Sequence, residues 1–171
     1  FKLANSESET SWGEFFIELK SRGLKSPRLM TSDNHHGLVT AIGKHFQGTT
    51  WQRCQTHFSR NLLDRAPKSI QPKLKEDIRS IYEATDLKSA KAAKERIMDQ
   101  YESTAPKAMN LLDEAFDDIT AVLCLPFKYR KRLRTTNGVE RLNEEIRRRE
   151  RVIRIFPNEA STLRLMGALL M

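Results

Sequence analysis

Residues 28–57 read RLMTSDNHHGLVTAIGKHFQGTTWQRCQTH, and their pattern indicates an α/β fold. Its first five residues, 28–32, and the alternating residues 49–54 are both typical of short β-strands. Between them, residues 37–46 place apolar side chains on one side of a helix, and Gly48 ends that helix. A strand, a helix and a second strand in so short a stretch form a βαβ unit, so the two strands are predicted to be parallel.

The sequence on both sides of this unit is predominantly helical. Upstream, Ser11 and Glu14 have the spacing of a capping box, and Gly23 is placed to end the helix that follows them. Downstream, residues 58–125 carry apolar positions at helical spacing and show no strand pattern. We therefore predict an α/β protein that is mostly helical.

These patterns divide the chain into three parts. Residues 1–57 hold the βαβ unit, and residues 58–126 form an all-helical insertion. In that insertion Asp86 is placed to cap one helix and Pro106 to begin another. Residues 127–171 hold a basic segment and C-terminal helices that return to the first part.

The third part contains two expected helices. Asn137 is a good N-cap with Glu140 three residues further on, and the helix is expected to run to about Arg149. Pro157 marks a break, and a final helix is expected to start near Ser161.

Positive charge is concentrated in one segment. The whole chain has a formal net charge of +8, and residues 127–154 alone hold eleven basic and four acidic residues, a net charge of +7. Such a segment favours a polyanion, most simply nucleic acid, because binding releases condensed counterions. The candidate DNA-binding residues are Lys131, Arg132, Arg134, Arg141, Arg147, Arg148, Arg149 and Arg151. The alternative is a solvated helix face with intrahelical ion pairs, Glu144 with Arg148 and Glu145 with Arg149.

Two further counts exclude other classes of protein. The chain has two cysteines, Cys54 and Cys124, so it has neither a disulfide framework nor a four-cysteine zinc site, and a reducing cytoplasm is the natural compartment. Its longest apolar runs have seven residues, whereas a membrane-spanning helix needs about 18. No membrane partner is expected.

Two carboxylates stand where a metal site would need them. Asp33 follows the first strand, and ligands in open α/β sheets gather at the carboxyl ends of strands. Glu140 lies inside the basic segment, a layout that suits metal-assisted chemistry on a phosphodiester, and Glu144 and Glu145 compete with it for that role. Either acid can instead be a cap: Asp33 of a turn, which the pattern alone favours, and Glu140 of its own helix.

Cys54 and His57 follow the second strand with two residues between them. They supply two zinc ligands, which is half of a tetrahedral site. A single Cys and His are more often packed or hydrogen-bonded groups, so zinc is disfavoured. A Cys–His nucleophile pair is weaker still, because nothing in the sequence orients the histidine.

Several short motifs, taken together and in this order, resemble the mutator-type transposases of bacterial insertion sequences. The resemblance rests on Ser32-Asp33 with His35 and Gly37-Leu38, Trp51-Gln52-Arg53-Cys54 with His57 and Arg60-Asn61, Thr135-Thr136-Asn137 with Glu140-Arg141-Leu142-Asn143, Arg147-Arg148-Arg149, and Phe156-Pro157. The helical stretch between the second and third motifs also agrees with the family.

This resemblance implies a partial RNase H-like core with an all-α insertion. It implies a DDE-type transposase, in which three carboxylates bind two Mg²⁺ or Mn²⁺ ions, with Asp33 as the second carboxylate and Glu140 as the third. Cys54, His57, Asn137 and Asn143 belong to the family signature, with an uncertain role. The implied partners are DNA, as transposon ends and as target, and further copies of the chain in a bacterial cytoplasm; no small-molecule substrate is expected.

The resemblance also implies that the sequence is an internal fragment. Phe1-Lys2-Leu3 would be the tail of a third strand, and the first carboxylate would lie upstream of Phe1. We therefore expect no nuclease activity from these residues alone. Two alternatives remain open: a non-catalytic nucleic-acid-binding domain, in which Asp33 and Glu140 are caps that lie far apart, and a helical interaction module whose weak DNA binding is insensitive to salt.

Overall fold

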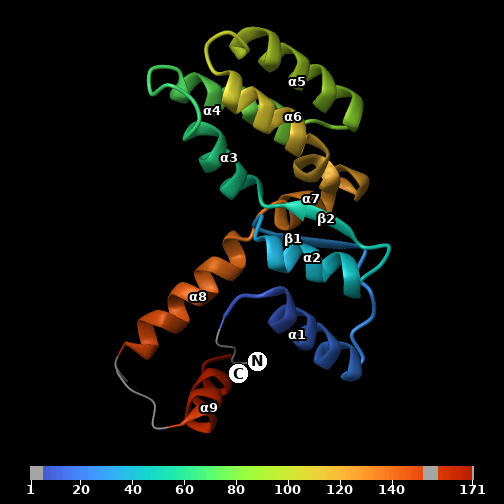
Figure 1. Cartoon of the computed structure of the whole chain (residues 1–171), viewed down its shortest axis with the longest axis vertical. Helices are drawn as coiled ribbons and strands as arrows, with labels where there is room; N and C mark the ends of the chain where they lie inside the picture. Colours follow the sequence, from blue (N-terminus) through green and yellow to red (C-terminus); the bar gives the residue numbers. More distant parts are fainter. Residues whose placement is uncertain (1–5, 152–157, 171) are drawn as a thin grey trace.

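A computed structural model describes residues 6–151 and 158–170, which are mostly helical around one small parallel sheet (Figure 1). The elements in chain order are α1 (Glu9–Ser21), β1 (Leu29–Ser32), α2 (His36–His45), β2 (Thr50–Arg53), α3 (Gln55–Leu63), α4 (Gln71–Tyr82), α5 (Leu87–Tyr101), α6 (Pro106–Thr120), the 3₁₀ turn η1 (Ala121–Cys124), α7 (Phe127–Leu133), α8 (Asn137–Glu150) and α9 (Glu159–Leu170).

The sheet is the predicted βαβ unit. β1 pairs with β2 in parallel, and Ser32 is opposite Arg53 at the last pair. Helix α2 is the crossover between them. Because parallel strands run the same way, the residues that follow β1 and β2 emerge at the same edge, called here the carboxyl edge.

Two helix starts differ from the sequence prediction by a few residues. Ser8, not Ser11, is the N-cap of α1, and its side chain accepts a hydrogen bond from the Ser11 amide at 3.1 Å. Thr136, not Asn137, is the N-cap of α8. Neighbouring residues that can all accept such a bond compete for a cap, and tertiary contacts decide between them. The predicted stop at Gly23 is confirmed, with a φ of 95° that favours glycine.

The helices of the insertion follow the sequence closely. Asp86 caps α5 by accepting the Ser89 amide at 2.7 Å, and Pro106 is the first residue of α6. The insertion's first helix, α3, already begins at Gln55. The expected final helix is α9, whereas the suggested strand tail at residues 1–3 and the Phe156-Pro157 motif lie outside the described residues.

Two hydrophobic cores lie on either side of the sheet. In Figure 1, α1 and α2 occupy one side and the helices α3–α6 the other. The smaller core joins α1 to α2 through Phe16, Ala41, Ile42 and Phe46. The larger one fills the helical insertion; its largest fully buried side chains are Phe58, Leu62, Leu74, Ile78, Ile81, Met109, Leu112 and Ile119.

A glycine sets the distance between α1 and α2. A β-carbon added at Gly37 would lie 2.8 Å from the backbone nitrogen of Glu9, closer than real β-carbon contacts. The glycine of the Gly37-Leu38 motif therefore allows α2 to approach the start of α1.

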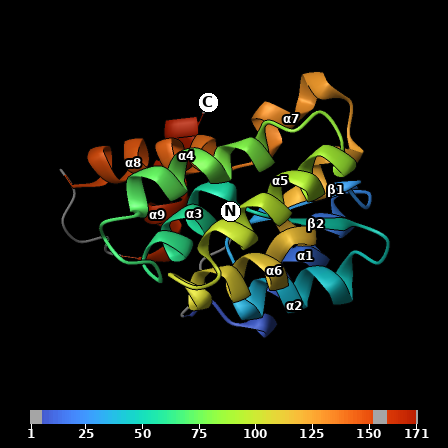
Figure 2. The same cartoon turned by 90° about the horizontal axis from the view of Figure 1, so that it is seen from above.

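Two buried glutamines join the insertion to the sheet. Gln52 on β2 is fully buried; its Nε2 donates to the Ile119 carbonyl at 3.0 Å and its Oε1 accepts the Val122 amide at 2.6 Å. Gln55 Nε2 donates to the same Ile119 carbonyl at 2.8 Å. These bonds hold the end of α6 against β2, where both views show the two elements side by side (Figures 1 and 2).

Within the described ranges, every helix is too short or too polar to cross a lipid bilayer.

Candidate active site

The junction between α7 and α8 is tied to the carboxyl edge of the sheet. Thr31 Oγ1, on β1, donates to the Leu133 carbonyl at 2.5 Å. The amide of Gln55, just after β2, donates to the Arg134 carbonyl at 3.0 Å. As a result, α8 starts beside the ends of both strands although more than 80 residues separate it from β2 in sequence.

Thr136 connects the start of α8 to both Glu140 and Cys54. Its Oγ1 lies 2.6 Å from Glu140 Oε1 and 3.3 Å from Cys54 Sγ, and its backbone amide donates to Cys54 Sγ at 3.4 Å. A hydroxyl has one proton, so the shorter contact, to the carboxylate, is the hydrogen bond. The cap role considered for Glu140 is therefore wrong: its carboxylate accepts the Thr136 hydroxyl, while the Thr136 amide is directed at sulfur.

Cys54, His57 and Glu140 form one cluster of metal-ligand side chains. Their ligand atoms all lie within 4.8 Å of one another, and His57 Nε2 is 3.7 Å from Glu140 Oε1. Cys54 is fully buried, whereas the side chains of His57 and Glu140 are 32% and 37% exposed. The pattern of Cys54 and His57 was visible in the sequence; folding adds Glu140 as a third member.

Asp33 lies at the same edge, beside this cluster. The Cys54 amide donates to the carbonyl of Ser32 at 2.7 Å, so Asp33 and Cys54 are neighbours across the ends of the two strands. Asp33 is exposed, and its carboxylate has no hydrogen bond or ion pair with any described residue. It does not cap α2, whose N-cap is His35.

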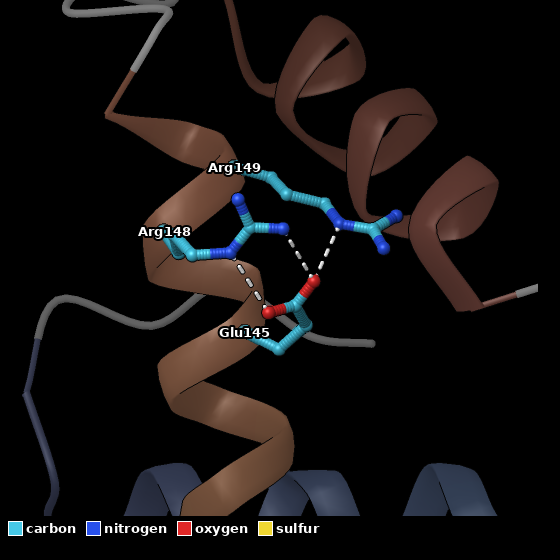
Figure 3. A network of polar contacts seen from close by, with 3 residues as sticks. All are labelled: Glu145, Arg148 and Arg149. Atoms are coloured by element: carbon cyan, nitrogen blue, oxygen red, sulfur yellow. Dashed lines mark hydrogen bonds and ion pairs between the residues drawn. The ribbon is translucent and has the colours of Figure 1, made fainter.

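Glu145 is held by two arginines and is thereby removed from the candidate carboxylates. Arg148 donates to both of its oxygens, at 2.8 and 2.9 Å, and Arg149 Nε donates to Oε1 at 2.9 Å (Figure 3). These bonds lower the pKa of Glu145 to about 2. The expected Glu145–Arg149 pair is confirmed, but Arg148 pairs with Glu145 rather than with Glu144.

The described part of the basic segment is mostly exposed. Arg134 is partly buried, and the other candidate DNA-binding residues are exposed: Lys131, Arg132, Arg141, Arg147, Arg148, Arg149 and Arg151. Arg130 differs from them, because its guanidinium donates to the carbonyls of Leu123, Thr85 and Leu125 at 2.7–2.9 Å. Arg130 therefore attaches α7 to the insertion, whereas Lys131 and Arg132 are exposed.

A pocket of about 320 Å³ adjoins the cluster. Two cations, Lys131 and Arg134, line it together with the polar residues Gln55, Thr56, Ser59, Tyr82, Thr135 and Asn137. Thr135 and Asn137 flank Thr136, the residue that contacts Glu140, but Glu140 itself does not line the pocket. Asn137, a member of the sequence motif, thus lines this pocket instead of capping α8, while Asn143 is exposed further along the helix.

Comparison with known protein families now identifies the chain. The family described as "Transposase, Mutator family" matches residues 1–171. The chain belongs to the Mutator family of transposases.

Its relatives are named as transposases of insertion sequences. The chain is 43% identical over its whole length to the transposase for insertion sequence element IS256 in transposon Tn4001 from Staphylococcus aureus, covering 44% of that protein. It is 41% identical to the transposase for insertion sequence element ISRM5 from Rhizobium meliloti and 38% identical to that of IS1081 from Mycobacterium tuberculosis, covering 42% and 41% of them. The chain therefore spans less than half the length of these relatives.

Two residues that shape the site escaped the sequence reasoning. In the sequence Thr136 stands out only as part of a motif, and its contact with Cys54 spans 82 residues, which no local pattern reveals. For Gln52 the sequence does offer a signal of a structural role, because it is a polar residue in the middle of a short β-forming stretch. A buried glutamine of this kind must find hydrogen-bond partners, and here they lie in the insertion.

Proposed function

We propose that this chain carries two of the three catalytic carboxylates of a DDE-type DNA transposase, Asp33 and Glu140, on a partial RNase H-like core. The observation that carries the proposal is the attachment of the α7–α8 junction to the carboxyl edge, through Thr31 with Leu133 and Gln55 with Arg134. Asp33 follows β1 at this edge, and Glu140 lies in the first turn of α8. Phosphoryl-transfer enzymes of this kind need carboxylates that converge from separate elements.

The donor set fits divalent ions such as Mg²⁺ or Mn²⁺. These ions prefer carboxylate oxygens, and the Asp33 carboxylate is exposed and unpaired among the described residues. Glu140 uses Oε1 for Thr136 and His57, so the contacts with described residues leave Oε2 available. When bound, a pair of such ions activates the attacking oxygen and stabilises the leaving oxygen of the phosphodiester.

The remaining residues would position the DNA and the acids. Thr136 holds the Glu140 carboxylate in place through its hydroxyl. Lys131 and Arg134, which line the pocket with Thr135 and Asn137, are suited to a backbone phosphate close to the cleaved bond. The exposed arginines of α8 extend this positive surface and would fix the position of DNA without reading its sequence.

We assign the proposed DNA cleavage to the full-length protein and not to residues 1–171 alone. By the family pattern the first carboxylate precedes Phe1, so residues 1–171 alone would bind DNA without cutting it. In the complete transposase the expected reaction is strand cleavage at the element's ends, followed by strand transfer, in a bacterial cytoplasm and by more than one copy of the chain.

A strand-cleavage assay with three variants of the full-length protein tests this proposal. Asp33→Asn and Glu140→Gln should each abolish Mg²⁺-dependent cleavage and retain DNA binding, because they remove metal ligands and leave the basic surface intact. Glu144→Gln is the matched control, because Glu144 is an exposed acid one turn further along α8. Activity of Glu140→Gln near the parental level would exclude Glu140 as a ligand. Loss with Glu144→Gln instead would move the role to that residue.

A further inference from the structure

We propose that Cys54, His57 and Glu140 form a binding site for a thiophilic divalent ion, with Zn²⁺ as the representative ligand. The site differs from the proposed Mg²⁺ site in its donor atoms and shares only Glu140 with it. Its existence does not depend on the proposed function, whereas its effect on DNA cleavage rests on that function.

The spacing of the three side chains suits one ion. Zinc bonds of about 2.0–2.3 Å in a tetrahedron place neighbouring ligand atoms roughly 3.4–3.8 Å apart. His57 Nε2 and Glu140 Oε1 are already 3.7 Å apart, and all three ligand atoms lie within 4.8 Å of one another. Side-chain adjustments of about 1 Å would bring Cys54 Sγ to the same ion.

The sulfur of Cys54 faces the other two ligands although the residue is fully buried. The backbone amide of Thr136 donates to Sγ at 3.4 Å, and Thr136 is the residue that also holds Glu140. The sulfur is therefore turned toward the start of α8, the same direction as the carboxylate, and not into a hydrophobic core.

His57 presents its Nε2 atom to the cluster, 3.7 Å from Glu140 Oε1, so Nε2 is the ligand atom of the proposed site. Its Nδ1 is buried and has no hydrogen-bond partner among the described residues. An ion bound at Nε2 would leave Nδ1 unchanged, so the proposal rests on Nε2 and the two ligand atoms next to it.

The donor set selects the class of ion. One sulfur, one imidazole nitrogen and one carboxylate oxygen are the ligands that Zn²⁺ takes in proteins, whereas Mg²⁺ strongly prefers oxygen alone. Because His57 and Glu140 remain about one-third exposed, the ion has a route of entry and a fourth position open to water. Zinc bound here would occupy Glu140 and so compete with the ions of the cleavage site.

Cobalt titration of the full-length protein tests the site, because Co²⁺ replaces Zn²⁺ and gives a sulfur-to-metal absorption band when a thiolate binds it. The parent and Cys124→Ser, which removes the exposed cysteine, should both show the band, and Zn²⁺ should abolish it. Cys54→Ser should lack it, and His57→Gln should weaken binding at least about tenfold. Circular dichroism checks that each variant folds. If Cys54→Ser does not fold, the weaker Co²⁺ binding of His57→Gln decides the test.

A separate variant distinguishes this proposal from the proposed function. Asp33→Asn should abolish cleavage and leave Co²⁺ and Zn²⁺ binding unchanged, because Asp33 is not a member of the cluster. Absence of the band in the parent, or an equal band in Cys54→Ser, would overturn the zinc site whatever the cleavage assay shows.

Discussion

Thr136 Oγ1 and Glu140 Oε1 lie 2.6 Å apart across the first turn of α8, and the Thr136 amide contacts the sulfur of Cys54 at the end of β2. One threonine thus fixes the Glu140 carboxylate relative to the sheet. A carboxylate that is held in this way needs no rearrangement when it receives a ligand, which is the value of a preorganised site.

Replacing Thr136 tests this positioning role. Thr136→Ala should lower the rate of DNA cleavage by about 10- to 100-fold, since hydrogen bonds to charged groups contribute about 1.5–3 kcal/mol. Thr136→Ser keeps the hydroxyl and should stay within a few fold of the parent. The measurement is single-turnover cleavage with saturating DNA, accompanied by the DNA dissociation constant, which should not change. Equal rates for the alanine and serine variants would refute the role.

Gln52 should be important for stability, because it joins β2 to the insertion through two buried hydrogen bonds. Gln52→Ala leaves the Val122 amide and the Ile119 carbonyl with fewer partners and should lower the free energy of unfolding by about 2–4 kcal/mol. Gln47→Ala, at an exposed position, should change it by less than about 0.5 kcal/mol. Urea unfolding of both variants measures the difference, and similar midpoints would contradict it.

Arg130 and Lys131 are adjacent but should behave differently. Lys131→Ala should weaken DNA binding for every sequence and reduce the slope of log affinity against log salt by about one, as expected for one lost phosphate contact. Arg130→Ala should lower thermal stability, because its three carbonyl partners lose their donor. Lys107→Ala, an exposed lysine on α6, is the control for charge alone. Equal salt slopes for Lys107→Ala and Lys131→Ala would argue against a phosphate contact at Lys131.

The lowered pKa of Glu145 predicts that the stability of α8 depends on pH. Its pKa is about 2 in the folded chain against an ordinary value of 4.5, because Arg148 and Arg149 donate to the charged carboxylate. The folded state therefore binds fewer protons, so the stabilisation is fully present above about pH 4.5 and is lost as the pH falls toward 2. Amide exchange in α8 should accelerate over this interval in the parent. In Glu145→Gln the dependence should be smaller; an identical profile would exclude the pair as its source.

The sequence predicts the local parts of the fold well. The βαβ unit of residues 28–54 follows from hydrophobic pattern and glycine stops, and both are properties of a few neighbouring residues. The predicted caps, Ser11 and Asn137, lie three residues and one residue from the observed caps, Ser8 and Thr136, since several neighbouring residues can cap equally well.

The contacts that build the site join residues that are far apart in the sequence. Cys54 and Thr136 are 82 residues apart, and Gln52 meets Ile119 across 67 residues. Periodicity carries no information about such pairs, because they depend on how the insertion packs against β2. The motifs identified the residues of the site, and the folded chain shows which of them meet.

A switch in metal preference at position 33 tests whether Asp33 binds the catalytic ions. In the full-length protein, Asp33→Cys replaces an oxygen ligand by sulfur, which Mg²⁺ accepts poorly and Mn²⁺ accepts better. If Asp33 binds the catalytic ions, cleavage by this variant should be lost in Mg²⁺ and recover at least in part in Mn²⁺, while DNA binding is unchanged. Parental activity in Mg²⁺, or no difference between the two ions, would contradict the assignment.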